Sequence, residues 1–367
     1  MMLKAIAYAD KWVRRFWQRV SSNVSVNPES LGVFRVIVGL FLLLFYAPYS
    51  LWLREVPQAF FDPPLLSFAN LFNNFPPAYV LYSLDMLGLV SLGLLTVGVK
   101  TRIATFTLFF TGIVSKNFLY SFGKIDHDIL LWALLLCMMF SGWGTKFALL
   151  PDKPAKFDRP RLALSLLAVL TAFGMFTAGF QKVFFWLDFD PNTSGFLNWF
   201  YSGYHVLERT DLLAPLIPLI PAALFELVDY VAVVFELTGF VFLLLGRRAW
   251  RAWLVTAAAF HLVNILTLNI TFNAHLLVYF AFVDFVALGQ RFRLKPPNFM
   301  RGVAVLTFIL VTVRAVRLSL GQGSSFLFVG GPAVTDPVIL YVSSVFWMFA
   351  IAVLLSNLYL STTNLNK

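Results

Sequence analysis

The chain has 367 residues, of which 59% are hydrophobic, 17% aromatic and only 13% charged. A water-soluble domain cannot bury that much apolar surface, so the composition excludes a soluble globular protein and predicts an integral membrane protein. The net charge of +10 fits Lys and Arg gathered in loops on one side of a membrane, and we expect no nucleic-acid partner.

The first predicted element is an N-terminal amphipathic helix over residues 1–24. Its apolar and basic side chains fall mostly on different helical faces, a pattern typical of a helix lying on an anionic membrane surface. The apolar face carries Ile6, Val13, Phe16, Trp17 and Val20, and the basic face carries Lys11, Arg14, Arg15 and Arg19.

Ten apolar runs follow, each within a few residues of the length of about 20 that a membrane span needs. They cover 31–53, 78–98, 103–122, 129–144, 162–181, 222–246, 253–268, 275–289, 303–320 and 338–360. The fourth, seventh and eighth are short, as expected for spans inside a bundle. The sequence therefore predicts an all-α, polytopic transmembrane helix bundle of about ten spans.

Charge gives the orientation, because most of the 28 basic residues fall in the N-terminal segment, the C-terminus and alternate loops. By the positive-inside rule that side is cytoplasmic, so both termini are predicted inside and loops 54–77, 184–221 and 321–337 outside. We expect a multi-pass protein of the plasma (inner) membrane. Three parts are predicted: the interfacial helix 1–24, a transmembrane core 25–290, and two C-terminal spans in 291–367.

Charged residues inside spans are functional candidates because they are costly to place in lipid. Arg35 lies one turn into the first run. The sixth run has three acids on one helical face, and the ninth has two arginines at spacing 3. These five are Glu226, Asp229, Glu236, Arg314 and Arg317. An interior ion-pair network and a proton path both fit the pattern, and the sequence leaves their role open.

Histidine occurs only four times, always on the predicted outer half. His127 stands between Asp126 and Asp128, where a carboxylate would tune the imidazole for acid–base work or simply join a solvated charge cluster. His261 and Asn264 are one turn apart inside a run, and His275 begins the next, so these polar groups either join helices or line a cavity. The spacings match no metal-ligand motif, and the lone Cys137 excludes a cysteine-based metal centre, so we expect no metal site.

Lys182 stands at the outer end of the fifth run, in TAGFQKVFFW. It either extends to water at the membrane surface or is held in apolar surroundings, where an amine loses its proton more readily and acts as a base. Apolar residues continue after it, and the nearest acid in sequence, Asp188, is six residues along. We therefore expect a largely neutral amine.

Four stretches together resemble the vitamin K-dependent γ-carboxylases and the wider horizontally transferred transmembrane (HTTM) domain family, over roughly residues 25–290. They are SLGVFRVIVGL at 30–40, KIDHDILLWALLL at 124–136, AGFQKV at 178–183 and FHLVN at 260–264. The large luminal domain of the animal carboxylases has no counterpart in this sequence, and Asp126 stands where the family usually has an asparagine. The resemblance therefore implies a short form of the family.

The resemblance implies an enzyme that uses a reduced quinone in an outer-leaflet cavity, where hydroquinone oxygenation to the epoxide drives proton abstraction and, in the carboxylases of the family, carboxylation. Lys182 and His127 would be catalytic, and His261, Asn264 and Asp126 would bind the quinone, supported by Arg35, Asp128 and His275. The implied cofactor is reduced vitamin K or a related menaquinol. The partners would be membrane lipids, the quinone and, on the outer side, a protein or peptide substrate. The alternative is a non-enzymatic membrane protein that binds or transports a lipid or small molecule.

Overall fold

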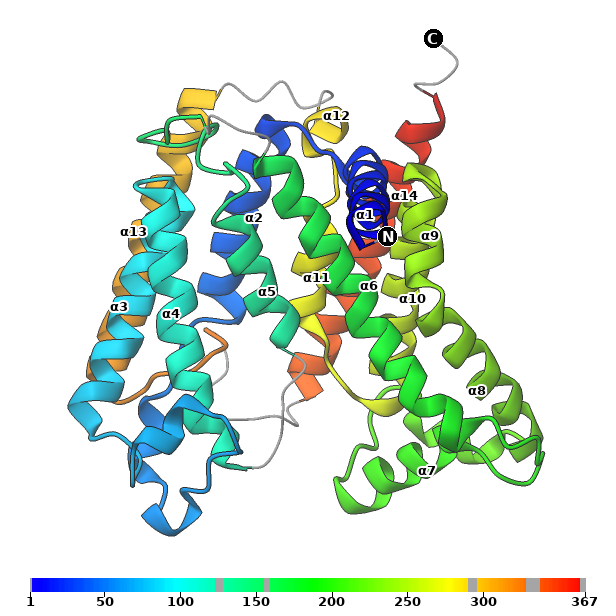
Figure 1. The fold of residues 1–367 in the computed structure, drawn as a ribbon. Helices are drawn as coiled ribbons and strands as arrows, with labels where there is room; N and C mark the ends of the chain where they lie inside the picture. The colour runs from blue at the N-terminus through cyan, green and yellow to red at the C-terminus, as the bar shows by residue number, and fades with distance from the viewer. Residues whose placement is uncertain (1, 123–127, 155–158, 290–295, 328–336, 364–367) are drawn as a thin grey trace. The chain divides into compact units, whose positions relative to one another are not determined.

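The computed structural model describes residues 2–122, 128–154, 159–289, 296–327 and 337–363. Every regular element in this part of the chain is a helix (Figure 1), and the β-type contact recorded there is an isolated bridge between Val99 and Leu150. The predicted all-α class is confirmed.

Seven of the described helices are long and apolar enough to cross a membrane. They are α2 (Pro28–Phe45), α3 (Ala78–Val97), α4 (Thr101–Leu119), α6 (Arg159–Trp186), α10 (Arg247–Leu268), α13 (Pro296–Ser319) and α14 (Pro337–Thr363). Helices α8 (Ala222–Leu237) and α9 (Gly239–Leu245) meet at a bend of 48° and make an eighth span if they cross as one. This set indicates a multi-pass membrane protein.

Two of the ten predicted runs form helices shorter than a span. The run 129–144 contains α5 (Ile129–Met138), and the run 275–289 is divided between α11 (Asn273–Phe280) and α12 (Phe285–Gly289). A ten-residue helix is about 15 Å long, half of the hydrocarbon core. Residues 274–280 of α11 are all buried. The total of ten spans and the cytoplasmic position of both termini stay predictions.

The contacts within the chain define two compact units. Unit 1 comprises Met1–Ser25, Leu164–Val283 and Thr335–Lys367, and unit 2 comprises Val26–Ala163 and Asp284–Val334. Helix α13 packs on α2 and α3 in unit 2, whereas α14 packs on α10 and α11 in unit 1. The predicted boundary at residue 290 therefore does not coincide with these units.

Local sequence signals set the ends of the main helices. Asn27 caps α2 by accepting a hydrogen bond from the backbone N–H of Ser30 at 2.7 Å, and Pro28 occupies the first helical position. Gly98 ends α3 with φ +77°, a conformation open to a residue without Cβ. Asn269, with φ +51°, ends α10 in the same left-handed region.

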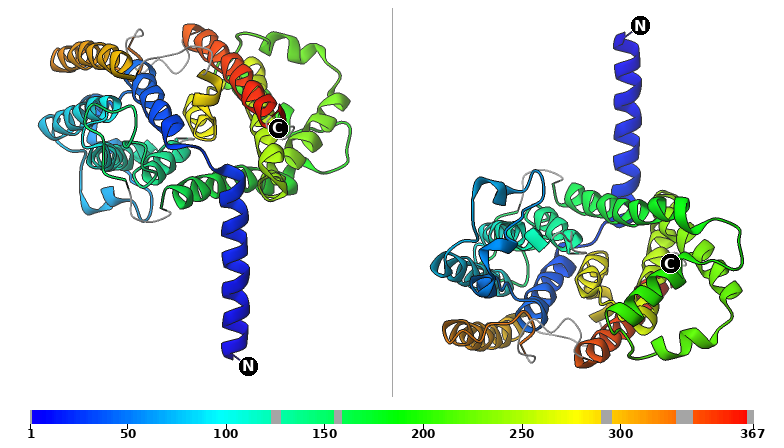
Figure 2. Two further views of the ribbon diagram at one scale, coloured as in Figure 1. Left: turned by 90° about the horizontal axis from the view of Figure 1, so that it is seen from above. Right: turned by 90° about the horizontal axis from the view of Figure 1, so that it is seen from below.

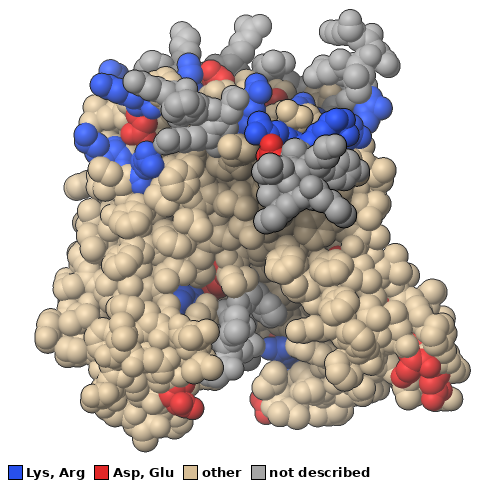
Figure 3. All heavy atoms as spheres, viewed as in Figure 1, with Lys and Arg blue, Asp and Glu red and all other residues tan. Residues whose placement is uncertain are grey.

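The helices of each unit expose large apolar side chains, as lipid-facing surfaces do. On α13 and α14 these include Phe308 and Phe349, which are 73% and 61% exposed. In each unit viewed by itself, Figure 3 shows basic side chains toward one end of the helices and a largely uncharged body below them. This distribution agrees with membrane spans whose basic ends lie on one side.

Helix α1 (Met2–Val24) belongs to unit 1, and its N-terminal half projects away from the other helices of the unit (Figure 2). Its C-terminal half docks on the end of α9. The Arg19 guanidinium donates hydrogen bonds to the carbonyls of Leu244 and Leu245 at 3.0 and 3.1 Å, and the Asn23 amide donates to that of Leu243 at 2.9 Å. A cation there is favourable because the last carbonyls of a helix lack partners and carry partial negative charge.

Candidate functional site

The candidate site in unit 1 is built on an ion pair between Lys182 of α6 and Glu236 of α8. The Nζ atom of Lys182 lies 2.6 Å from Oε1 of Glu236, and the side chains are only 23% and 3% exposed. The pair joins residues 54 positions apart in the chain. A charge pair this sheltered from water interacts far more strongly than a surface pair.

Gly179 lets α6 and α8 approach closely enough to form this pair. A Cβ placed on Gly179 would stand 2.7 Å from the Cβ of Glu236, which is too close for any larger residue without a shift. Gly179 and Lys182 are three residues apart and share one face of α6. The lysine also lies near the C-terminal end of α8, where the unpaired carbonyls favour a cation.

Aromatic rings surround the ammonium group on its other sides. The Nζ atom lies 4.7 Å from the ring centre of Trp186 and 5.8 Å from that of Phe260. Both distances suit an interaction of the cation with the face of an aromatic ring. Trp186 is fixed in turn by Gly195 at the start of α7 (Gly195–Tyr201), where a Cβ would collide with the indole.

A second polar group lies next to the pair and centres on His261 of α10. Its Nε2 atom is 2.8 Å from the hydroxyl of Tyr279 on α11, and its ring centre is 5.1 Å from that of His275. His261 and His275 are buried, and Tyr279 is completely so. Either ring nitrogen of His261 can carry the proton, so Nε2 can either donate a hydrogen bond to the Tyr279 hydroxyl or accept one from it.

Phe260 links the ion pair to the histidine group. It lies against the Lys182 ammonium on one side, and its ring centre is 5.7 Å from that of the neighbouring His261. A carboxylate, an ammonium, an imidazole and a phenol hydroxyl thus occupy adjacent positions inside one unit. Together these groups can accept, donate and stabilise charge at a site largely shielded from water.

The structure brings together three of the predicted site residues, Lys182, His261 and His275. Asn264 is half-buried on α10, one turn from His261. Asp126 and His127 lie outside the described residues. In unit 2, Asp128 pairs with Lys116 of α4 at 2.6 Å, with side chains 6% and 17% exposed.

Arg35 has a local partner set in unit 2. Its side chain is completely buried and donates hydrogen bonds to the backbone carbonyls of Trp143 and Phe147. The absence of a side chain at Gly98 makes room for it, because a Cβ there would lie 2.6 Å from the Arg35 guanidinium. Arg35 thus fixes the segment after α5 to α2.

The apolar surroundings expected for Lys182 are only part of its environment, because a carboxylate lies 2.6 Å from Nζ, and the charge of the amine stays a prediction. The partner is Glu236, 54 positions along the chain, and none of the acids close to Lys182 in sequence. The nearest of these, Asp188, has its own partners in the loop after α6: hydrogen bonds from the backbone N–H of Asp190 and the hydroxyl of Thr193 lower its pKa.

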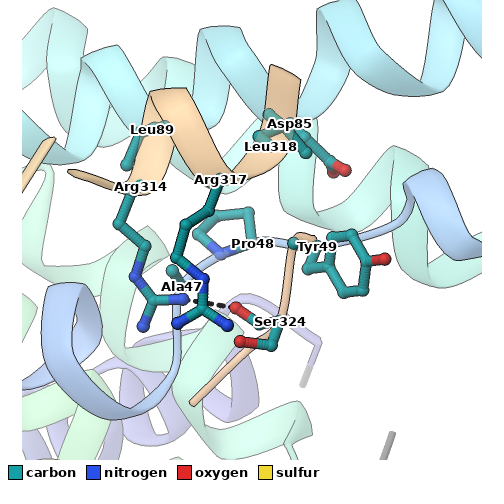
Figure 4. Close-up of a pocket in the computed structure, with 10 residues that line it drawn as sticks. Ala47, Pro48, Tyr49, Asp85, Leu89, Arg314, Arg317, Leu318 and Ser324 are labelled. Atoms are coloured by element: carbon teal, nitrogen blue, oxygen red, sulfur yellow. Dashed lines mark hydrogen bonds between the residues drawn. The ribbon is translucent and has the colours of Figure 1, made fainter. Parts of the chain in front are cut away.

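Both arginines and two of the three intramembrane acids find partners within their own units, whereas both carboxylate oxygens of Glu226 are buried with no hydrogen-bond partner in the described part of the chain. Asp229 caps α7 by accepting hydrogen bonds from the backbone N–H groups of Gly195 and Phe196 at 2.8 and 2.9 Å. Arg314 reaches from α13 toward Ser324 (Figure 4) and binds four carbonyls, those of Leu43, Leu44, Ser324 and Ser325. Arg317 binds the carbonyl of Leu327. A small pocket lined by Arg314 and Arg317 has a volume of about 20 Å³, which is room for about one water molecule.

Two residues that the structure places at polar contacts, Lys116 and Tyr279, were not predicted from the sequence, and neither was the role of Glu236. Lys116 carried a signal, because it is a lone basic residue near the end of a span, as Lys182 is. Glu236 lies on the predicted acidic face of α8, but its partner depends on how α8 rotates against α6. Tyr279 sits in an apolar run with no local pattern that marks it.

No protein-family model, no curated protein and no solved structure matches the chain. The resemblance to the γ-carboxylase and HTTM families therefore stays a prediction. Among the described residues, no three His, Cys, Asp or Glu side chains come together as a group that could hold a metal ion.

Proposed function

We propose that the chain is an integral membrane enzyme that removes a proton from a lipid-soluble hydroquinone at the Lys182–Glu236 pair. One observation carries the proposal. Oxygen Oε1 of Glu236 binds the lysine, while the buried Oε2 has no hydrogen-bond partner in the described part of the chain. A buried carboxylate oxygen without a partner is costly, and a hydroxyl donor would satisfy it.

The pair divides the chemistry between its two members. Glu236 accepts the hydroxyl proton, and the Lys182 ammonium stabilises the negative charge that develops on the substrate oxygen. Lys182 acts here as a cation, in place of the base that the family resemblance implies. Trp186 and Phe260 provide ring faces against which a planar substrate ring stacks, and the adjacent His261–Tyr279 contact supplies a route for the released proton.

The finer parts of the proposal come from the family resemblance. The hydroquinone would be reduced vitamin K or a menaquinol. Its conversion to the epoxide would be coupled to proton abstraction and carboxylation. The site would lie in the outer leaflet, open to a protein or peptide substrate. Asn264, one turn from His261, would contact a quinone oxygen.

The test is quinol turnover by the full chain in lipid nanodiscs, with menaquinol and oxygen supplied and both quinol loss and epoxide measured. Glu236→Gln and Lys182→Met should each lower the rate about a hundredfold or more, as expected for loss of a positioned acid–base group. Glu55→Gln is the matched control, since its side chain is 72% exposed, and it should keep the full rate. Wild-type turnover in both site variants would overturn the proposal.

The same experiment separates the enzyme from the non-enzymatic alternative. A binding or transport protein would retain menaquinol in the purified complex without consuming it. In that case Glu236→Gln would change the amount of bound quinol and no reaction rate.

A further inference from the structure

Unit 2 contains a cavity of about 260 Å³, and the cavity shares no lining residue with the Lys182 site in unit 1. It lies beside α4 and α5 and is also lined by the segment that follows α2. Its lining includes Tyr46, Tyr49, Trp52, Leu108, Lys116 and Trp132. Binding cavities are typically of this kind, with mostly apolar and aromatic walls and a few polar groups.

Two polar residues of the lining, Ser115 and Lys116, lie at one end of the cavity. Lys116 and Ser115 stand near the end of α4, whereas Leu108 lies two turns earlier, about 12 Å along the helix axis. On α5 the lining residue Leu135 lies one turn deeper than Leu131. A molecule in the cavity would therefore have one end at a hydroxyl and an ammonium and the other among leucines.

The charge at the polar end disfavours a strongly anionic ligand. Asp128 lies 2.6 Å from Lys116, so among the described residues the ammonium already has a carboxylate partner. An added anion would be repelled by the Asp128 carboxylate. A neutral molecule with an oxygen atom fits this end better.

Gly112 makes room for an aromatic wall of the cavity. A Cβ on this residue would lie 2.1 Å from the indole of Trp132, so the glycine allows Trp132 to pack closely against α4. Trp132 is 9% exposed and forms a rigid wall. Rigid aromatic walls favour a flat ring system over a flexible chain, because the ring loses less conformational entropy on binding.

We infer that this cavity is a binding site for a neutral, ring-containing amphiphile whose oxygen lies at Lys116 and Ser115 and whose rings extend toward Leu108. A cavity of about 150 Å³ binds benzene, so this one suits roughly ten non-hydrogen atoms, or two fused rings. The inference does not depend on the proposed function, because all of its residues belong to unit 2.

The probe is tritiated 2-naphthol, measured by saturation binding to the full chain in nanodiscs, with the signal of empty nanodiscs subtracted. We expect saturable binding of one molecule per chain. Leu108→Trp, which fills the apolar end, should weaken binding at least tenfold. The control is Leu136→Trp, because Leu136 is 38% exposed on α5 and does not line the cavity. This variant should bind 2-naphthol as tightly as the wild type does.

The polar end is tested by changing the ligand as well as the protein. Ser115→Ala and the double variant Lys116→Met/Asp128→Asn should weaken 2-naphthol binding about tenfold but leave naphthalene binding unaltered, because naphthalene has no oxygen. The double variant avoids leaving Asp128 as a buried unpaired charge. Ser115→Leu, which blocks the polar end, is a second filling variant if Leu108→Trp does not fold.

Three results would overturn the inference. The first is no saturable binding of 2-naphthol, and the second is equal 2-naphthol binding by the wild type and by both Leu108→Trp and Ser115→Leu. The third is complete displacement of 2-naphthol by hexadecane at equal concentration. The last would identify the cavity as a site for a lipid tail. Lys182→Met should keep 2-naphthol binding, so a failure of the proposed function would leave this inference standing.

Discussion

Gly179 and Glu236 lie so close that a Cβ on the glycine would stand 2.7 Å from the glutamate Cβ. The contact allows α6 and α8 to approach and fixes the spacing at which Lys182 reaches its carboxylate. Small residues at helix contacts have this effect in membrane proteins, where packing replaces the hydrophobic effect.

We expect Gly179→Ala to lower the free energy of unfolding by about 1–3 kcal/mol, the usual range for overpacking. Thermal unfolding in detergent, followed by circular dichroism, measures the effect. Gly302→Ala is the matched control, because a Cβ at Gly302 on α13 meets no atom within 4 Å. Equal melting temperatures for the two variants would show that the close contact is unimportant.

The Lys182–Glu236 pair should show strong coupling in a double-mutant cycle. Lys182→Met alone leaves a buried carboxylate unpaired, which costs about 3–5 kcal/mol, whereas the double variant Lys182→Met/Glu236→Gln removes both charges and should recover most of that loss. The Asp10–Arg14 pair, with side chains 55% and 74% exposed, should give a coupling below about 1 kcal/mol. Additive effects at Lys182 and Glu236 would contradict the buried pair.

Membrane sidedness can be tested with cysteine labelling because the native Cys137 is only 2% exposed and should give little background. Lys153→Cys and Asn198→Cys both place a thiol at an exposed position. A membrane-impermeant maleimide added to intact cells should label the second variant and not the first, as the positive-inside rule predicts. Labelling of both from outside would contradict the predicted orientation.

Arg19 should hold α1 to the rest of unit 1 through the carbonyls at the end of α9. We expect Arg19→Ala to speed hydrogen exchange in residues 16–24 severalfold, because the helix loses two charge-assisted hydrogen bonds. Arg15→Ala is the control, since Arg15 is exposed on the same helix. The same exchange rate in both variants would show that the α9 contact does not order α1.

Much of the fold was predictable because apolar length and loop charge are properties of local sequence. All ten apolar runs contain helix, yet the bend after Leu237 and the shortness of α11 depend on packing that hydropathy does not record. For the site, the sequence identified Lys182, His261 and His275 as polar residues in apolar runs. It could not supply Glu236 as the partner of Lys182, since that contact depends on how two helices rotate against each other.

The distance of 54 residues between Lys182 and Glu236 has a consequence for biosynthesis. The chain is made from its N-terminus, so α6 leaves the ribosome and meets the translocon before α8 exists. During that interval the lysine ammonium has no Glu236 to pair with, and its charge opposes stable insertion of the outer end of α6. Lys116 is only 12 residues from Asp128, so its carboxylate partner is synthesised almost immediately after it. Membrane integration of unit 1 should therefore depend on later helices, and a chain truncated after α6 should be retained by the translocon or degraded.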